Sequence, residues 1–154
     1  MGGLPPTFLI IMAKTKYNVD KETAKRTFDG IVFDSKLEMQ FYRDVVLPKF
    51  ESGEIKHYEL QKVFILQPGF RRDGKAILPI KYVADFYLEY ADGRVEVIDT
   101  KGMPDTAANL KRKMMWYHYP DLDYKWMSHT KATGWVTYDE LKKIRNERKK
   151  GKDK

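Results

Sequence analysis

The chain has 154 residues, 42% of them hydrophobic and 14% aromatic, which is enough for one domain with a core and excludes a wholly disordered protein. Cysteine is absent, so a disulfide framework and a thiolate metal site are excluded. The formal net charge of +7 indicates an anionic partner, nucleic acid before a membrane surface, and the alternative is a basic surface that is only solvated.

Residues 1–27 are predicted to be an N-terminal extension and a basic arm. The first eleven residues include an apolar run that is too short to span a membrane and lacks the features of a signal peptide. Because Met12 follows this run, we expect an upstream-start extension. Lys14, Lys16 and Arg26 in the arm are candidates for phosphate contacts, with simple solvation as the alternative. The absence of cysteine and of a signal peptide suits a cytoplasmic protein.

A helix is predicted to begin after Ser35, preceded by a turn and a short strand over residues 28–33. Ser35 with Glu38 three residues later is the pattern of a capping box. This pattern favours a capping role for Glu38, and the alternative is a carboxylate that points into the core. Pro48 is expected to limit the helix. Its apolar stripe has four-residue spacing: Leu37, Phe41 and Val45.

Three strands are predicted next, over residues 59–70, 76–90 and 95–101. Pro79 inside the second strand predicts an edge position or a break. Strict alternation puts Asp85 on one face of that strand. The opposite face then carries a row of apolar residues: Ile80, Tyr82, Ala84, Phe86 and Leu88.

The turn between the second and third strands decides whether two acidic side chains meet. A two-residue loop would pair Asp85 with Thr100 and put Asp85 and Asp99 on opposite faces of the sheet. A three-residue loop with Gly93 in the left-handed bulge position instead pairs Asp85 with Asp99. A shared site requires the second arrangement, so we predict the bulged turn.

The remaining elements are a helix over residues 107–117, a strand over 121–127, and a helix over 138–148 followed by a frayed basic tail. Leu110, Met114 and Tyr117 are expected on the apolar side of the first of these helices. Its basic band includes two candidates for phosphate contacts, Lys111 and Lys113. The aromatic residues near its end are expected in the core rather than stacked on bases: Trp116, Tyr117 and Tyr119.

The pair Asp85 and Asp99 suggests a metal site. Two adjacent carboxylates repel each other and raise each other's pKa unless a cation relieves the repulsion. Hard divalent cations such as Mg²⁺ need only one or two carboxylates with a substrate phosphate. Lys101 is expected about 6–7 Å further along the strand, near enough for a metal-bound water or a phosphate oxygen but too far for a tight pair with Asp99. Glu38 would add a third carboxylate.

A structural alternative is open for the same residues. An Asp-Thr-Lys triplet at a strand end is common, and Asp99 could simply pair with Lys101 or Lys81. The order of elements favours the functional reading. A helix with a glutamate comes first, then a meander with an acid on one strand and Asp-x-Lys on the next, and then a basic helix.

This order resembles the PD-(D/E)xK nuclease superfamily. The motif acid before the hairpin is Asp85, preceded by Ala84 rather than proline, and the second acid and lysine are Asp99 and Lys101. Glu38 matches the first-helix glutamate of many members. More particularly, three segments resemble a phage family of small resolvase-like nucleases, similar to archaeal-type Holliday-junction resolvases: DGIVFDSKLE, YVADF and VIDTKG.

The resemblance implies an α/β (α+β) fold with a restriction-endonuclease-like core. That core would be a mixed sheet with a first helix, an antiparallel meander, a second helix and a further strand. It would occupy residues 28–136, followed by a basic C-terminal helix and tail over 137–154. The resemblance also implies cleavage of branched DNA by a homodimer that uses Mg²⁺ or Mn²⁺. The implied metal ligands include Thr100 beside the three carboxylates.

Other functions stay open at this point. The chain could be another nuclease of the same superfamily that acts on DNA ends, transposon ends or a specific sequence. It could act on RNA. It could also be a non-catalytic DNA-binding domain that uses only its basic surface, in which case the acids and Lys101 would lie apart or be solvated.

Overall fold

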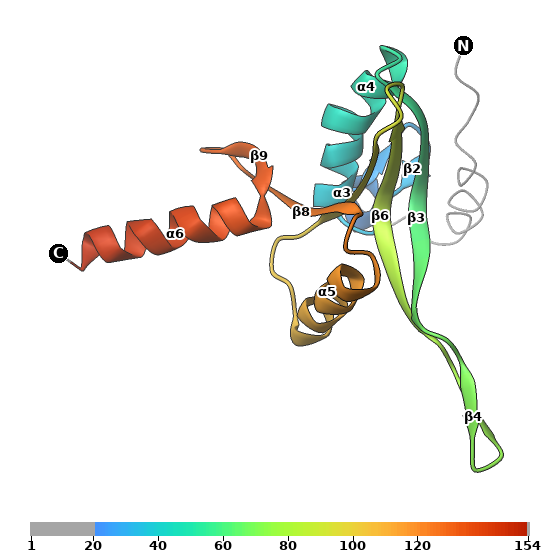
Figure 1. Ribbon diagram of the computed structural model, residues 1–154. Coiled ribbons are helices and arrows are strands. Elements are labelled where there is room, and N and C mark those ends of the chain that lie inside the picture. The colour runs from blue at the N-terminus through green and yellow to red at the C-terminus, as the bar shows by residue number, and fades with distance from the viewer. Residues whose placement is uncertain (1–20, 154) are drawn as a thin grey trace.

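A five-stranded mixed sheet forms the centre of this α+β fold, described by a computed structural model for residues 21–153 (Figure 1). Its strand order is β3–β6–β7–β8–β9, and only β7 and β8 pair in parallel. The strands are β3 (Ile55–Gln67), β6 (Ile80–Tyr90), β7 (Val95–Thr100), β8 (Asp123–Thr130) and β9 (Gly134–Thr137). The predicted meander and the later strand are therefore confirmed, whereas β9 was not predicted.

Helices and two small hairpins complete the described part of the chain. The helical segments are α2 (Lys21–Ala24), α3 (Lys36–Phe41), the π-helical η1 (Tyr42–Val46), α4 (Leu47–Glu51), α5 (Thr106–His118) and α6 (Tyr138–Lys152). One hairpin joins β1 (Thr27–Phe28) to β2 (Ile31–Val32), and the other joins β4 (Phe70–Arg72) to β5 (Lys75–Ile77). None of the helices in residues 21–153 is long and apolar enough to cross a membrane.

The first long helix begins where predicted but does not stop at Pro48. The Ser35 side chain accepts a hydrogen bond from the Glu38 backbone N–H and caps α3. The chain then continues through η1 into α4, and Pro48 lies in the first turn of α4. Proline lacks a backbone N–H, and the wider π turn just before it lets the helix continue without that donor. The prediction that Pro48 limits the helix is wrong.

Two clusters of buried side chains make up the core. The larger lies between the α3–α4 helix and strands β3 and β6, and includes Phe41, Tyr58 and Phe86. The smaller joins the other ends of β3 and β6 to α5 through Leu66, Tyr82, Ala84, Val97 and Met115. The candidate acids lie on β6 and β7, where these two clusters meet.

The turn between β6 and β7 has the predicted bulge. The pairing of Glu89 with Val95 continues to Tyr90, whose backbone N–H donates to the Arg94 carbonyl at 2.9 Å. The Gly93 N–H donates to the Tyr90 carbonyl, and Gly93 has φ +91°. Glycine adopts this left-handed conformation without a steric penalty. The register thus brings Asp85 and Asp99 to opposed positions, as predicted.

Gly93→Ala should lower the free energy of unfolding by about 1–2 kcal/mol, because a Cβ is strained at positive φ. Nothing lies within 4 Å of the added Cβ, so crowding would not contribute. Gly102→Ala is the matched control, since that Cβ also meets nothing within 4 Å and Gly102 is not at positive φ. Urea denaturation should separate the two variants, and equal stability would contradict the bulged turn.

The predicted alternation along β6 is confirmed as alternating burial from Tyr82 to Tyr90, but Ile80 is exposed and the buried residues join two different clusters. Phe86 and Leu88 belong to the larger core cluster, but Tyr82 and Ala84 belong to the smaller one. Opposite the break, Gln61 of β3 has φ +57°, between the regular pairs Leu60–Phe86 and Lys62–Ala84. A left-handed residue interrupts the regular alternation of a strand. One continuous apolar face from Ile80 to Leu88 was therefore the wrong expectation.

The apolar stripe predicted for α5 is also wrong. Met115 is its buried residue, whereas Tyr117 is 83% exposed and Trp116 is 49% exposed. Leu110 is exposed as well. Only part of the expected packing is present, since Met114 and Tyr119 contact the smaller core cluster. Arg112 of the basic band instead packs inward, with its side chain 11% exposed and its guanidinium 4.3 Å from the centre of the Trp126 ring.

Candidate functional site

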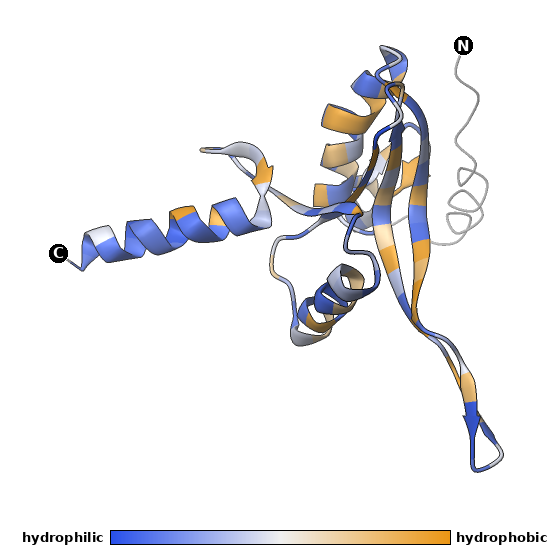
Figure 2. Ribbon diagram, in the orientation of Figure 1, coloured by the Kyte–Doolittle hydropathy of each residue, from blue (hydrophilic) through white to orange (hydrophobic). Residues whose placement is uncertain are grey.

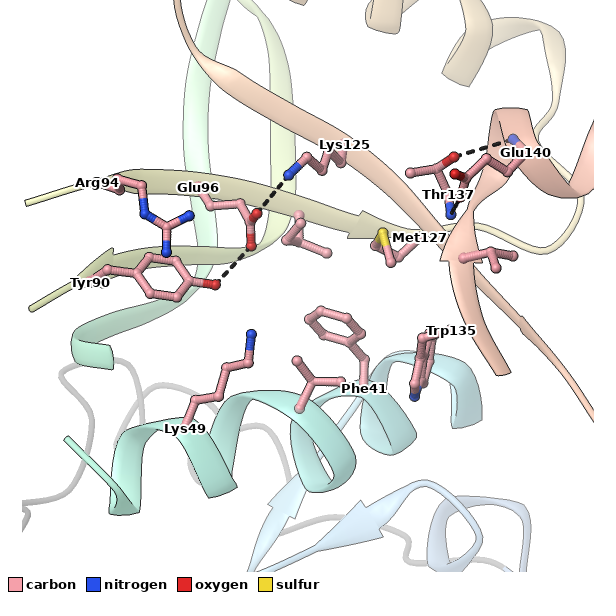
Figure 3. Close-up of a pocket in the computed structure, with 13 residues that line it drawn as sticks. Phe41, Lys49, Tyr90, Arg94, Glu96, Lys125, Met127, Trp135, Thr137 and Glu140 are labelled. Atoms are coloured by element: carbon pink, nitrogen blue, oxygen red, sulfur yellow. Dashed lines mark hydrogen bonds and ion pairs between the residues drawn. The ribbon is translucent and has the colours of Figure 1, made fainter. Parts of the chain in front are cut away.

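A pocket beside the sheet does not contain the predicted acids. It has a volume of about 350 Å³ and lies between the α3–α4 helix and strands β7, β8 and β9 (Figure 3). Its acid Glu96 accepts from the Tyr90 hydroxyl at 3.0 Å and pairs with Lys125 at 2.8 Å. Its other acid, Glu140, is used in the capping box of α6. Both carboxylates have structural partners, so this pocket is a weak candidate for catalysis.

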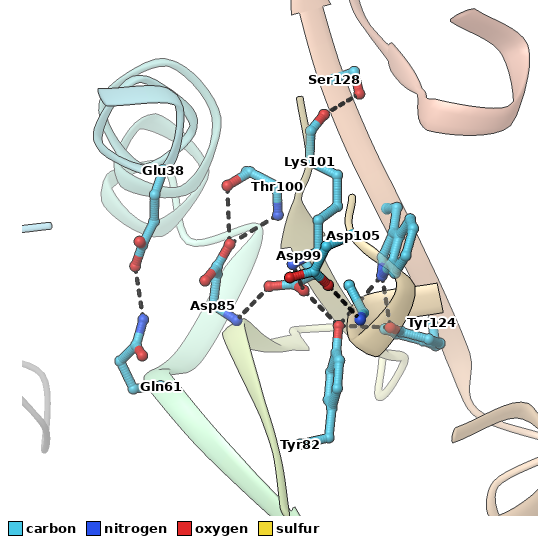
Figure 4. A network of polar contacts seen from close by, with 12 residues as sticks. Glu38, Gln61, Tyr82, Asp85, Asp99, Thr100, Lys101, Asp105, Tyr124 and Ser128 are labelled. Carbon is cyan, nitrogen blue, oxygen red and sulfur yellow. Dashed lines mark hydrogen bonds and ion pairs between the residues drawn. The ribbon is translucent and has the colours of Figure 1, made fainter. Parts of the chain in front are cut away.

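The candidate site lies where β6 and β7 separate. Their regular pairing ends at Phe86 and Ile98, and beyond it two side chains take over the bridging (Figure 4). The Asp85 backbone N–H donates to Asp99 Oδ1 at 3.2 Å, and the Thr100 N–H donates to Asp85 Oδ2 at 2.8 Å. We call Asp85, Asp99, Thr100 and Lys101 the acidic fork. Each carboxylate takes a hydrogen bond from the opposite strand, which fixes both.

Lys101 lies against Asp99 rather than beyond it. Its Nζ is 2.9 Å from Asp99 Oδ2, so the predicted spacing was wrong and the ion pair of the structural alternative is present. Strand β7 ends at Thr100, and the spacing of an extended strand therefore does not apply to Lys101. The Lys101 ammonium also lies 5.5 Å from the centre of the Trp126 ring. The fork therefore contains two acids and one cation in direct reach.

A chain of hydrogen bonds supports Asp99 from the side of α5. The Tyr82 hydroxyl donates to Asp99 Oδ2 at 2.5 Å, the Tyr124 hydroxyl donates to the Tyr82 oxygen at 2.5 Å, and Trp126 Nε1 donates to the Tyr124 oxygen at 2.7 Å. Burial, followed by the charge of Asp99, raises the pKa of Tyr82. Tyr82 thus stays a hydrogen-bond donor at physiological pH.

Sequence reasoning did not find this support. Tyr82, Tyr124 and Trp126 alternate on the strands that carry or flank the acids, but no motif distinguishes them from core aromatics. The spacing of Tyr124 and Trp126 was the one sign of a shared role, since a separation of two residues on a strand places both side chains on the same face of β8, the parallel neighbour of β7. Only the register shows that they point to Asp99.

Glu38 lies beside the fork but has another partner. Its side chain is 3% exposed, and its carboxylate accepts from Gln61 Nε2 at 2.8 Å (Figure 4). Ser35 caps α3 as predicted, but the favoured capping-box contact of Glu38 with Ser35 is replaced, because the Glu38 carboxylate turns inward to Gln61 and its backbone hydrogen bond is with Asp34. Burial, then the charge of Asp34, raises the pKa of Glu38 to about 7, and the charge of Asp99 contributes to the same shift.

Asp85 is the most strongly perturbed acid of the fork. Burial raises its pKa well above the ordinary value, and the charges of Asp99 and then Glu38 raise it further. The hydrogen bond from the Thr100 backbone opposes this shift. Thr100 also donates from Oγ1 to Asp85 at 2.9 Å. Thr100 therefore serves Asp85 as a donor through both its backbone and its side chain.

The donor set of the fork fits a small divalent cation. Carboxylate oxygens suit Mg²⁺ or Mn²⁺, and a cation between Asp85 and Asp99 would remove the repulsion that raises the Asp85 pKa. Within residues 21–153, no group of three or more histidine or acidic side chains is arranged to hold a metal ion. Two carboxylates would therefore be the direct protein ligands, with Glu38 close by and bonded to Gln61.

The predicted phosphate contacts have mixed positions. Lys14 and Lys16 lie outside the described residues. Arg26 donates a hydrogen bond to the Phe33 carbonyl, which holds it against the β1–β2 hairpin. Lys113 is exposed on α5 and Lys111 is half-buried. Of the three candidates that the structure describes, Lys113 is the one whose position leaves it most open to a phosphate.

Comparison with known proteins gives a family but no activity. Residues 14–134 match a protein family described as Protein of unknown function (DUF1064). No curated protein matches the chain. The matched range includes both strands of the acidic fork and all of α5.

Proposed function

The chain belongs to the DUF1064 family, and we propose that it is a metal-dependent DNA endonuclease of the PD-(D/E)xK superfamily that acts on branched DNA as a Holliday-junction resolvase. One observation carries this proposal. Asp85 and Asp99 meet between two separating strands, and Lys101 lies at the same point. The pKa of Asp85 is raised, and a divalent cation would relieve the charge repulsion that contributes to this shift. Strongly perturbed acids in such a group are typical of catalytic centres.

The order of elements supports a restriction-endonuclease-like core. Helix α3 comes first, then the antiparallel strands β3, β6 and β7, then α5, and then β8 parallel to β7. Asp85 lies on the second strand of this meander and Asp99 on the third. This is the order that the resemblance implies for such nucleases.

The residues of the fork have separable tasks in phosphodiester hydrolysis. A bound divalent ion supplies an activated water and offsets the charge that develops on the phosphate. Asp85 and Asp99 would hold that ion, while Thr100 and Tyr82 keep their carboxylates in place through the hydrogen bonds described above. Lys101 extends from beyond the strand end, so its ammonium can donate to a phosphate oxygen or orient the attacking water.

The substrate and the assembly are parts of the proposal that rest on the resemblance. The formal charge of +7 favours a polyanionic substrate. Branched DNA and a homodimer are what the phage resolvase-like family implies, since two active centres would cut two strands. Another nuclease of the same superfamily, acting on DNA ends, transposon ends or a specific sequence, would use the same fork.

The proposal predicts paired, symmetric nicks in a four-way junction when Mg²⁺ is present, and none in EDTA. The assay compares a labelled four-way junction, a fork, a linear duplex and single strands. If the linear duplex is cut as fast as the junction, the protein is a nuclease but not a Holliday-junction resolvase. Binding to DNA without cleavage in Mg²⁺ or Mn²⁺ would instead identify a non-catalytic DNA-binding domain.

Lys101→Met should lower the rate of cleavage about 100-fold, because the variant loses a cation that stabilises charge in the transition state. Binding of Mn²⁺, measured by calorimetry, should persist or improve, because Asp99 loses its competing ion pair. Lys125→Met is the matched control, since Lys125 pairs with Glu96 on the same sheet. If the two variants cleave DNA at the same rate, Lys101 takes no part in the reaction.

A further inference from the structure

Helix α6 extends away from the sheet and packs on it only near its own start (Figure 1). It is hydrophilic over nearly its whole length (Figure 2), and Leu141 is its one fully buried residue. The predicted frayed tail is wrong, because the helix continues to Lys152. A helix that is polar all round and packs on little needs another source of stability.

The cations of α6 are sorted by face. Lys142, Arg145, Lys149 and Lys152 follow one another at spacings of three, four and three residues, which places them in one line along the helix. We call these four residues the cationic stripe. The acids Glu140 and Glu147 lie instead on the side of Lys143. The cations of the stripe thus lie apart from these acids, whereas Lys143 and Lys150 on the other side of α6 lie beside them.

The cationic stripe lacks internal compensation. None of its four side chains forms an ion pair with a described residue, although Lys142 lies near enough to Asp139 to help lower the pKa of that acid. Like charges three and four residues apart destabilise a helix. A polyanion laid along this face would remove that repulsion. The stripe is about 15 Å long, which allows contact with several successive phosphates.

The start of α6 is linked to the acidic fork through one aromatic ring. The Trp126 ring lies 5.5 Å from the Lys101 ammonium and 5.6 Å from the ring of Tyr138, the first residue of α6. Arg112 of α5 stacks on Trp126 and pairs with Asp139. Tyr138 is also four residues before Lys142, on the line of the cationic stripe. The stripe therefore runs outward from the fork.

We propose that the cationic stripe of α6 binds the phosphate backbone of the DNA arm that leads into the acidic fork. The choice of DNA rests on the proposed function. An anionic membrane is a poorer partner, because a helix that binds at a membrane surface needs an apolar face to insert. On α6 the apolar residues near the stripe are few, and Leu141 is already buried.

The test compares two double variants of the full-length chain: Lys142→Gln/Lys149→Gln on the stripe and Lys143→Gln/Lys150→Gln off it. Both remove two lysines seven residues apart from the same helix. Binding to a labelled 30-base-pair duplex in EDTA is measured across a range of salt concentrations. The stripe variant should bind about ten- to thirty-fold more weakly at 0.15 M salt, with a salt slope smaller by about 1.8. The other variant should stay within about threefold of wild type.

Equal weakening in both variants would overturn the proposal, because it would show only a loss of net charge. Wild-type DNA binding by the stripe variant would also overturn it. So would a stripe variant that keeps its DNA binding and loses only its binding to anionic phosphatidylserine vesicles, measured in parallel. Circular dichroism verifies that α6 still forms. The outcome is separate from that of the nuclease proposal, since binding in EDTA requires no cleavage. Stripe-dependent binding without cleavage in Mg²⁺ would keep this inference and remove the nuclease.

Discussion

Asp85→Asn should lower Mg²⁺-dependent DNA cleavage by about 1,000-fold while the fold and DNA binding persist. The burial and neighbouring charges that raise the Asp85 pKa favour a neutral side chain there in the absence of a cation, and asparagine is neutral with nearly the same shape. Its amide oxygen can still accept from the Thr100 N–H and hydroxyl. The variant loses only the charge that a divalent ion needs.

Single-turnover cleavage with the protein in excess separates this chemical loss from a loss of binding. Asp123→Asn is the matched control, since Asp123 is an exposed aspartate at the start of β8 that pairs with Lys125. The control should cleave at the wild-type rate. If Asp85→Asn cuts DNA as fast as Asp123→Asn does, the acidic fork is not the active centre.

The second large effect concerns stability against pH in the absence of divalent ions. The folded-state pKa of Glu38 is about 7, against 4.5 for the ordinary group, so the folded chain holds a proton that the unfolded chain releases. Below pH 4.5 the carboxyl is protonated in both states. Between pH 4.5 and pH 7 the free energy of unfolding should therefore fall as pH rises, by about 3 kcal/mol from Glu38. Asp85 shifts stability in the same direction.

Urea denaturation in EDTA at a series of pH values measures this decline. Glu38→Gln should flatten the curve, because glutamine can keep a hydrogen bond to Gln61 without a charge. Glu147→Gln, on the exposed surface of α6, should leave the decline unchanged. A decline of the same size in both variants would mean that the buried position of Glu38 has no cost at neutral pH.

The hairpin geometry was predictable because local rules determine it. Gly93 follows an aspartate at the turn, and only one loop length brings Asp85 and Asp99 to opposed positions. Period-two alternation then gave both ends of β7 and the end of β6 to within a residue, whereas β6 begins at Ile80, after the break at Pro79, and not at residue 76. These features depend on a few neighbouring residues, so they can be derived from the sequence.

The surroundings of the acids were not predictable because they depend on contacts between distant elements. Gln61 can donate to the Glu38 carboxylate because β3 lies beside β6 and Gln61 itself has a left-handed backbone conformation. Lys101 reaches Asp99 because the strand ends one residue earlier. The exposed Trp116 and Tyr117 show the same limit, since their apolar character says nothing about which face of α5 meets the sheet.

Anomalous diffraction from crystals soaked in Mn²⁺ tests the central claim most directly, because it locates the ion without relying on activity. The account predicts a peak at bonding distance from the carboxylates of both Asp85 and Asp99, with the Lys101 ammonium displaced from its 2.9 Å contact with Asp99. The absence of any peak there at saturating Mn²⁺, with the Lys101–Asp99 pair intact, would contradict it.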